Sequence, residues 1–204
     1  MIYLKWNIIF LNLLFYGLSG FGQAYNSSLV KNLLPEIKGK DTIEIISFIE
    51  MPSFEAESAI RIVSCNDHCT FEGRFFKKNY WYDNYPYIKE KKEIPSPDIL
   101  FFSSSVSNEF AKKMKSAFSN AMKIKDPELR RRVDEKTYVT EIVNDGTIYV
   151  LRLNESGMMI SKQIPNPKKE DGRYNLIMSC SQMAMEINNQ SFEELKFKDI
   201  FNQD

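Results

Sequence analysis

The feature that most limits the fold is a series of short β-rich runs joined by connections too short for a crossover helix. Thr42–Glu50 and Ser58–Cys65 are rich in Ile and Val, and Cys69–Phe76 is aromatic and alternating, so each run predicts a strand. Parallel neighbours need a connection of about a dozen residues or more, whereas antiparallel neighbours need only a tight turn. The sequence therefore predicts antiparallel sheet in this part of the chain.

Apolar spacing predicts two main helices. From about Asn108 to Ile124, apolar residues recur on one side of a helix and three lysines share the opposite side. From about Tyr174 to Asn188, a second apolar stripe includes Cys180, which should point inward and behave as a small hydrophobic residue. The two stripes are Phe110, Met114, Ala117, Phe118 and Ala121, and Leu176, Cys180, Met183, Ala184 and Ile187; the lysines are Lys112, Lys115 and Lys123.

A second hairpin is expected within Lys136–Asn154, because Asp145-Gly146 can adopt the positive φ angles of a tight turn. A further turn at 155–157 should lead into a strand at Met158–Ile164. The hairpin register pairs Ile142 with Tyr149, Thr140 with Leu151 and Tyr138 with Leu153.

Short helices are expected from Asp126 to Val133, where Pro127 suits the first helical position, and after Ser191, which forms a capping-box pattern with Glu194. The predicted fold class is α+β, with antiparallel sheet of about six strands and two main helices.

The first two dozen residues have the order of a secretory signal. Lys5 supplies the charge, Ile8–Phe21 is almost wholly apolar, and Gly22-Gln23-Ala24 provides a small-residue exit. We therefore expect a signal peptide at residues 1–24 and a single domain at residues 25–204, exported to a periplasm or the exterior. A retained anchor is the alternative, although a membrane span needs about 20 apolar residues. No stable membrane span is expected after cleavage.

Composition excludes several classes of protein. With 204 residues, 43% hydrophobic and 26% charged, the chain is typical of one globular domain and not of a disordered or multispan protein. Its 27 basic and 27 acidic residues cancel, which removes the electrostatic case for a nucleic-acid partner. No glycine-rich phosphate-binding pattern occurs, so we expect no nucleotide and no other cofactor.

Cys65, His68 and Cys69 include the only histidine and two of the three cysteines. In an oxidising compartment, cysteines that border a three-residue turn can reach the Cα separation of a disulfide, about 4.4–6.8 Å. We therefore expect a disulfide between Cys65 and Cys69. A zinc site that adds Cys180 is an alternative that requires a distant thiol to converge, and free thiols or another pairing are a third. No metal site is predicted.

Signals for catalysis are weak. A serine triad needs a histidine, and His68 has no nucleophile elbow to serve. Cys69 is adjacent to His68, and adjacent residues of a strand face opposite sides, so the two could cooperate only in a distorted turn. Pairs of carboxylates are too easily found among 27 acidic residues to be specific. No catalytic residue is predicted.

The least average stretch is aromatic and leads into a long irregular segment, 83–98, which carries three prolines. Tyr and Trp offer large rigid faces with a polar edge, which suits a protein partner or a sugar ring. The alternative is that these side chains fill or cover the core. The predicted contact residues are Tyr80, Trp81, Tyr82, Asp83 and Tyr85.

These features favour an exported, nonenzymatic domain that binds an unknown protein or glycan partner. An envelope hydrolase that acts on glycan or peptide, through carboxylates or Cys69, is the first alternative. An immunity-type or structural envelope protein is the second.

Overall fold

The structure is a computed structural model that describes residues 29–37, 39, 41–53, 55–80, 83–84, 87, 90, 96–126, 130–132, 138–140 and 146–188. It contains two compact units, residues 1–36 and 37–204. In the first unit, residues 29–33 are helical, and the N–H of Leu34 donates to the carbonyl of Val30 at 2.7 Å. The predicted signal peptide and the predicted short helix after Ser191 lie outside the described residues.

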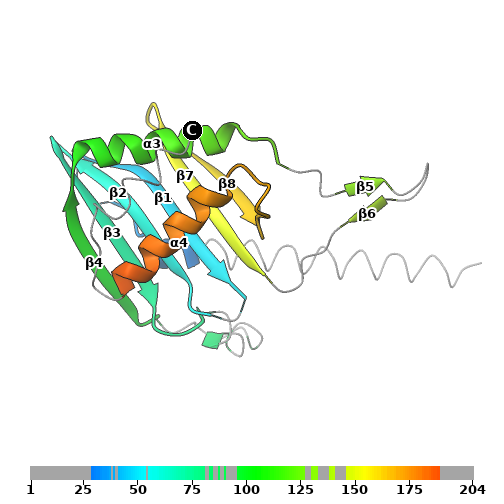
Figure 1. The fold of residues 1–204 in the computed structure, drawn as a ribbon. Coiled ribbons are helices and arrows are strands. Elements are labelled where there is room, and N and C mark those ends of the chain that lie inside the picture. Colours follow the sequence, from blue (N-terminus) through cyan, green and yellow to red (C-terminus); the bar gives the residue numbers. More distant parts are fainter. Residues whose placement is uncertain are drawn as a thin grey trace, which may run out of the picture. The chain divides into compact units, whose positions relative to one another are not determined.

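The second unit is built on a six-stranded sheet in the order β4-β3-β2-β1-β7-β8 (Figure 1). Each neighbouring pair of strands is antiparallel. The strands are β1 Thr42–Pro52, β2 Ser58–Cys65, β3 His68–Phe76, β4 Ile99–Val106, β7 Thr147–Glu155 and β8 Met158–Pro165. The predicted α+β class with antiparallel sheet is confirmed.

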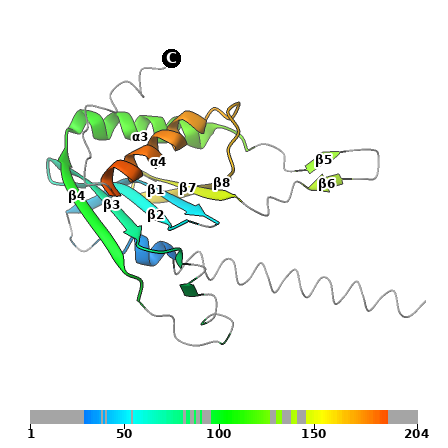
Figure 2. The ribbon, with the colours of Figure 1, turned by 60° about the horizontal axis from the view of Figure 1, so that its bottom comes forward.

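Two helices, α3 (Asn108–Lys123) and α4 (Tyr174–Asn188), cover one face of this sheet (Figure 2). The hydroxyl of Ser107 caps α3 by accepting a hydrogen bond from the N–H of Phe110 at 3.1 Å. Both helices match their predicted ranges to within one residue. Their apolar sides and the facing sheet residues form one core, which includes Phe110, Met114, Phe118, Ile177, Cys180, Met183, Ile187, Ile46, Phe48, Ile60, Ile62, Phe71 and Leu151.

The predicted second hairpin is wrong. Tyr138–Thr140 forms β6 and pairs with β5, Arg130–Arg132, while β7 pairs with β1 and β8. The physical reason is burial: Leu151 and Leu153 are at most 1% exposed under the helices, which a two-stranded ribbon could not achieve. β5 also replaces the end of the short helix predicted to run to Val133.

β4 was absent from the predicted strands. Its sequence, ILFFSSSV, pairs with β3 along all eight residues and forms one edge of the sheet. In the part of the chain that the structure describes, no helix is both long enough and apolar enough to cross a membrane.

Candidate functional site

The two edge strands of the described sheet differ in their protection against pairing with another strand. Natural edges are commonly blocked by charged residues, proline or a bulge. β8 carries Lys162 and Pro165. β4 carries no charged residue and no proline, and its register with β3 is continuous. Within the described residues, β4 is therefore the edge strand that lacks these blocking features.

Apolar side chains of β4 are open to solvent. Phe101 is 54% exposed and Leu100 is 42% exposed. Leu100 pairs with Phe75 and points to the helix side of the sheet, whereas Phe101 pairs with Arg74 and points to the other side. We call β4 with these two side chains the β4 edge. It offers an apolar contact on each face, beside the outward backbone groups of the strand.

Arg74 extends from β3 over this edge. Its guanidinium carbon lies 4.6 Å from the centre of the Phe101 ring, within the range of a cation–π contact. Its Nε is buried and makes no hydrogen bond within the part of the chain that the structure describes. Burial, followed by repulsion from Arg61, lowers the pKa of Arg74 against the opposing attraction of Glu72. The guanidinium therefore lies against Phe101 of the β4 edge and carries one N–H without an acceptor among the described residues.

The other charges on this face pair with one another. Arg61 is 5% exposed, and its Nε donates to Oε2 of Glu72 at 2.6 Å. Glu44 lies 3.8 Å from Arg61 and 3.6 Å from Arg152, between carboxylate oxygens and guanidinium nitrogens. Two carboxylates thus face two guanidiniums. Arg74 is left as a positive charge without an ion pair among the described residues.

The segment between β3 and β4 contains the predicted contact residues. Tyr80 is 3% exposed, and its ring stacks on Phe76 with centroids 4.9 Å apart. Its N–H donates to Oε2 of Glu57 at 2.7 Å. Tyr80 therefore follows the alternative in which aromatic residues complete the core. Asp83 is exposed. The other predicted contact residues, Trp81, Tyr82 and Tyr85, lie outside the described residues.

The β2–β3 hairpin corrects the predicted disulfide. The turn has two residues instead of three, so Cys65 pairs with His68 and Ser64 pairs with Cys69. Because Cys65 and Cys69 lie at successive pairs of the ladder, their side chains point to opposite faces. All three cysteines of the chain are free in the structure.

The same geometry separates the elements of a cysteine nucleophile. Cys69 is buried and its thiol donates to Oδ1 of Asn108 at 3.2 Å, while His68 is exposed beside Cys65. His68 therefore cannot take a proton from Cys69. Among the described residues, no group of three or more His, Cys, Asp or Glu is placed to hold a metal ion.

A cross-strand pair, Glu50 on β1 and Tyr149 on β7, was not singled out in the sequence. Burial raises the pKa of Glu50, and the neighbouring hydroxyls of Ser181 and Ser58 oppose that rise. Burial and the charge of Glu50 raise the pKa of Tyr149. Such a carboxyl can act as a general acid. Its possible proton-transfer partner, His68, is far from it. His68 pairs with Cys65 at the other end of β2, about 23 Å from Glu50 along the strand.

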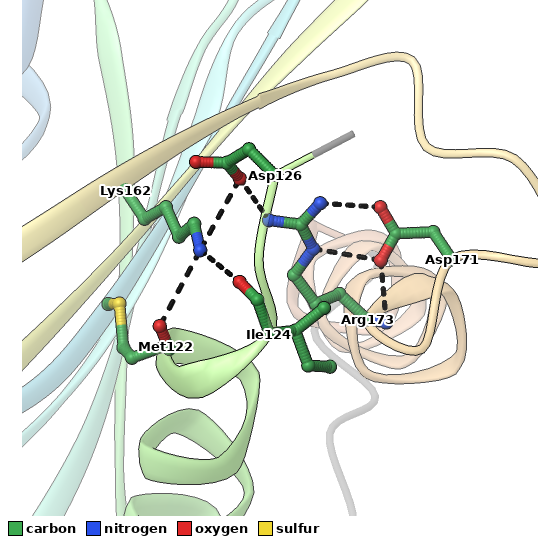
Figure 3. Close-up of polar contacts among 6 residues, drawn as sticks. All are labelled: Met122, Ile124, Asp126, Lys162, Asp171 and Arg173. Atoms are coloured by element: carbon green, nitrogen blue, oxygen red, sulfur yellow. Dashed lines mark hydrogen bonds and ion pairs between the residues drawn. The ribbon is translucent and has the colours of Figure 1, made fainter. Parts of the chain in front are cut away.

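A second ionic cluster links α3, β8 and α4. Arg173 donates from Nε and Nη2 to Asp171 at 2.8 and 2.6 Å, and from Nη1 to Asp126 at 2.6 Å (Figure 3). Lys162 donates to the carbonyl of Ile124 and lies 3.3 Å from Asp126. These contacts join the end of α3 to β8 and to the start of α4. We call these four charged residues the Arg173 cluster; its charges balance, which fits a structural role.

Comparison of the chain with protein-family models, with curated proteins and with solved structures found no match. The β4 edge with Arg74 is thus identified as the candidate site by its exposure, pairing and charge.

Proposed function

We propose that the chain is an exported, nonenzymatic binding domain that takes an extended segment of a partner protein as an additional strand beside β4. In this binding mode, backbone hydrogen bonds supply affinity and alternate side chains supply specificity. The observation that carries the proposal is the β4 edge: eight uncharged residues with Phe101 54% and Leu100 42% exposed.

An unprotected edge strand carries a risk of aggregation unless it binds a specific partner. A long, flat and apolar edge strand invites pairing with unrelated chains, and exposed apolar patches often mark interaction sites. The other edge, β8, shows the protection that β4 lacks. This contrast within one sheet favours a binding role for β4.

Export is the part of the proposal that rests on residues 1–24, with their charged start, apolar stretch and small-residue exit. An immunity-type protein, whose partner is a toxin, would use the same kind of surface and is a special case of this proposal. The hydrolase alternative has less support, because Cys69 is buried and His68 faces away from it.

Capture of partner proteins from an envelope extract tests the proposal. We expect Leu100→Lys and Phe101→Lys to lower capture of a bound partner at least about ten-fold, because lysine on an edge strand opposes pairing with a further strand. Crosslinking and quantitative mass spectrometry would measure the captured protein for the purified wild type and for each variant.

Matched controls come from the opposite edge, where Met158 is 71% and Ile160 is 37% exposed. Met158→Lys and Ile160→Lys should leave capture unchanged, and thermal melts would establish that all four variants fold. Equal capture by the β4 and β8 variants would reject the proposed function. So would an extract in which no captured protein is lost when β4 is changed.

A further inference from the structure

The position of Arg74 bears on what kind of strand the β4 edge accepts. Its guanidinium lies 4.6 Å from the ring centre of Phe101, the residue paired with it on β4. Neighbouring strands lie about 4.8 Å apart, so the guanidinium already reaches the outermost strand. A strand added beside β4 would place one side chain directly opposite Phe101, on the face that carries Arg74.

The guanidinium has the chemistry to bind that side chain if it is acidic. Arg74 Nε is buried without a hydrogen bond within the described residues, and the carboxylates on this face are paired with Arg61 and Arg152. Arginine makes its strongest contacts with carboxylates, through charge-assisted and often paired N–H bonds. A carboxylate on the added strand would supply the negative charge that Arg74 lacks among the described residues.

A second copy of the chain that pairs through its own β4 strand does not supply that carboxylate. β4 has no acidic residue between Ile99 and Val106, so pairing of two β4 strands would place apolar or serine side chains opposite Phe101. Asp98, just before the strand, is already paired with Lys77 at 2.7 Å. Charge complementarity therefore favours a different protein as the occupant.

We infer that the partner is an extended segment of another protein that carries Asp or Glu opposite Phe101, and that Arg74 binds this carboxylate. The inference rests on the proposed function, because it requires a strand added at the β4 edge. It names the chemistry by which that strand is recognised.

Selection from a display library of random peptides of about ten residues, the length of a long strand, tests the inference on the purified protein. Peptides whose binding is lost with Leu100→Lys would be taken as β4-dependent. We expect these peptides to share one acidic position. Replacing that acid with its amide should weaken binding to the wild type about ten-fold and leave binding to Arg74→Gln unchanged.

Because the acid-to-amide change is made in the peptide, the comparison on the wild type stands even if Arg74→Gln folds poorly. β4-dependent peptides without an acidic preference would overturn the inference and leave the proposed function intact. A library that yields no β4-dependent peptide would reject both. A dimer in light scattering that Phe101→Lys dissociates would assign the edge to a second copy and also overturn the inference.

Discussion

The two carboxylates of the Arg173 cluster share one cation but differ in their surroundings. Asp171 is 11% exposed and Asp126 is 60% exposed, while Arg173 is 1% exposed. Hydrogen bonds from Arg173 lower the pKa of Asp171 despite its burial. Burial acts to raise the pKa of Asp126, but hydrogen bonds from Arg173 and Lys162 outweigh it and lower that pKa. Asp171 should therefore be the dominant partner.

Removing Asp171 leaves the buried guanidinium largely uncompensated. We expect Asp171→Ala to lower the free energy of unfolding by about 3–5 kcal/mol, as for other broken buried ion pairs. The matched Asp126→Ala removes a more exposed partner and should cost about 1 kcal/mol or less. Urea unfolding at neutral pH measures both, and equal losses would contradict the assigned order.

Individual residues were predictable where a local pattern decides their environment. Cys180 falls on the apolar stripe of its helix, and it is fully buried as expected. The opposite orientations of Cys65 and Cys69 were not predictable, because one residue more or less in the turn changes which side chains face each other. Arg74 carried no signal in the sequence, since its significance depends on Phe101, which is paired with it from another strand.

At the scale of elements, α4 packs closely on β3 at Gly73. A Cβ atom built on Gly73 would lie 2.6 Å from Cγ2 of Ile187, closer than side-chain atoms approach. The absence of a side chain at Gly73 therefore allows α4 to pack directly on β3.

Gly73→Ala should lower the free energy of unfolding by about 1–3 kcal/mol, because the well-packed core must shift to admit the methyl group. Ile187→Ala removes the clashing carbon. In a double-mutant cycle, the double variant should therefore lose less unfolding free energy than the sum of the losses of the two single variants. Chemical denaturation of the two single variants and the double variant tests this. Strict additivity would contradict the contact.

Element identity followed from the sequence for the two helices and for β1, β2, β3 and β8, because their periodic patterns are strong and local. β4 was not predicted from the sequence, because four apolar residues followed by three serines show neither strand nor helix periodicity. The predicted strand partner of β7 was wrong, because the tendency of Asp145-Gly146 to form a tight turn is only a local preference. Pairing with β1 and β8 buries Leu151 and Leu153 far better.

At the scale of the whole molecule, Glu50 and the Arg173 cluster make stability depend on pH in opposite directions. The lowered pKa values of Asp126 and Asp171 contribute stability that is present above the ordinary aspartate pKa of 3.8 and is lost as the pH falls through their native pKa values. The raised pKa of Glu50 does the reverse: the native state favours the protonated carboxyl, so stability falls as the pH rises above 4.5.

Glu50→Gln removes this second dependence. We expect the variant to unfold at a higher temperature than the wild type near neutral pH, and the difference to disappear in acid below the unfolded-state pKa of the carboxyl. Thermal melts across the acidic and neutral range measure the difference. A variant that is less stable than the wild type at neutral pH would show that the ionised carboxylate of Glu50 stabilises the fold.

The sequence by itself determined the antiparallel α+β class, the apolar sides of α3 and α4, and the inward position of Cys180, because apolar periodicity is a property of neighbouring residues. Only the tertiary structure decided which strands pair with β7, that β4 forms an edge of the sheet, and that Arg74 lies beside Phe101 with no ion pair among the described residues. Those outcomes depend on contacts between residues far apart in the chain, which are chosen by the burial of the whole core and not by any local pattern.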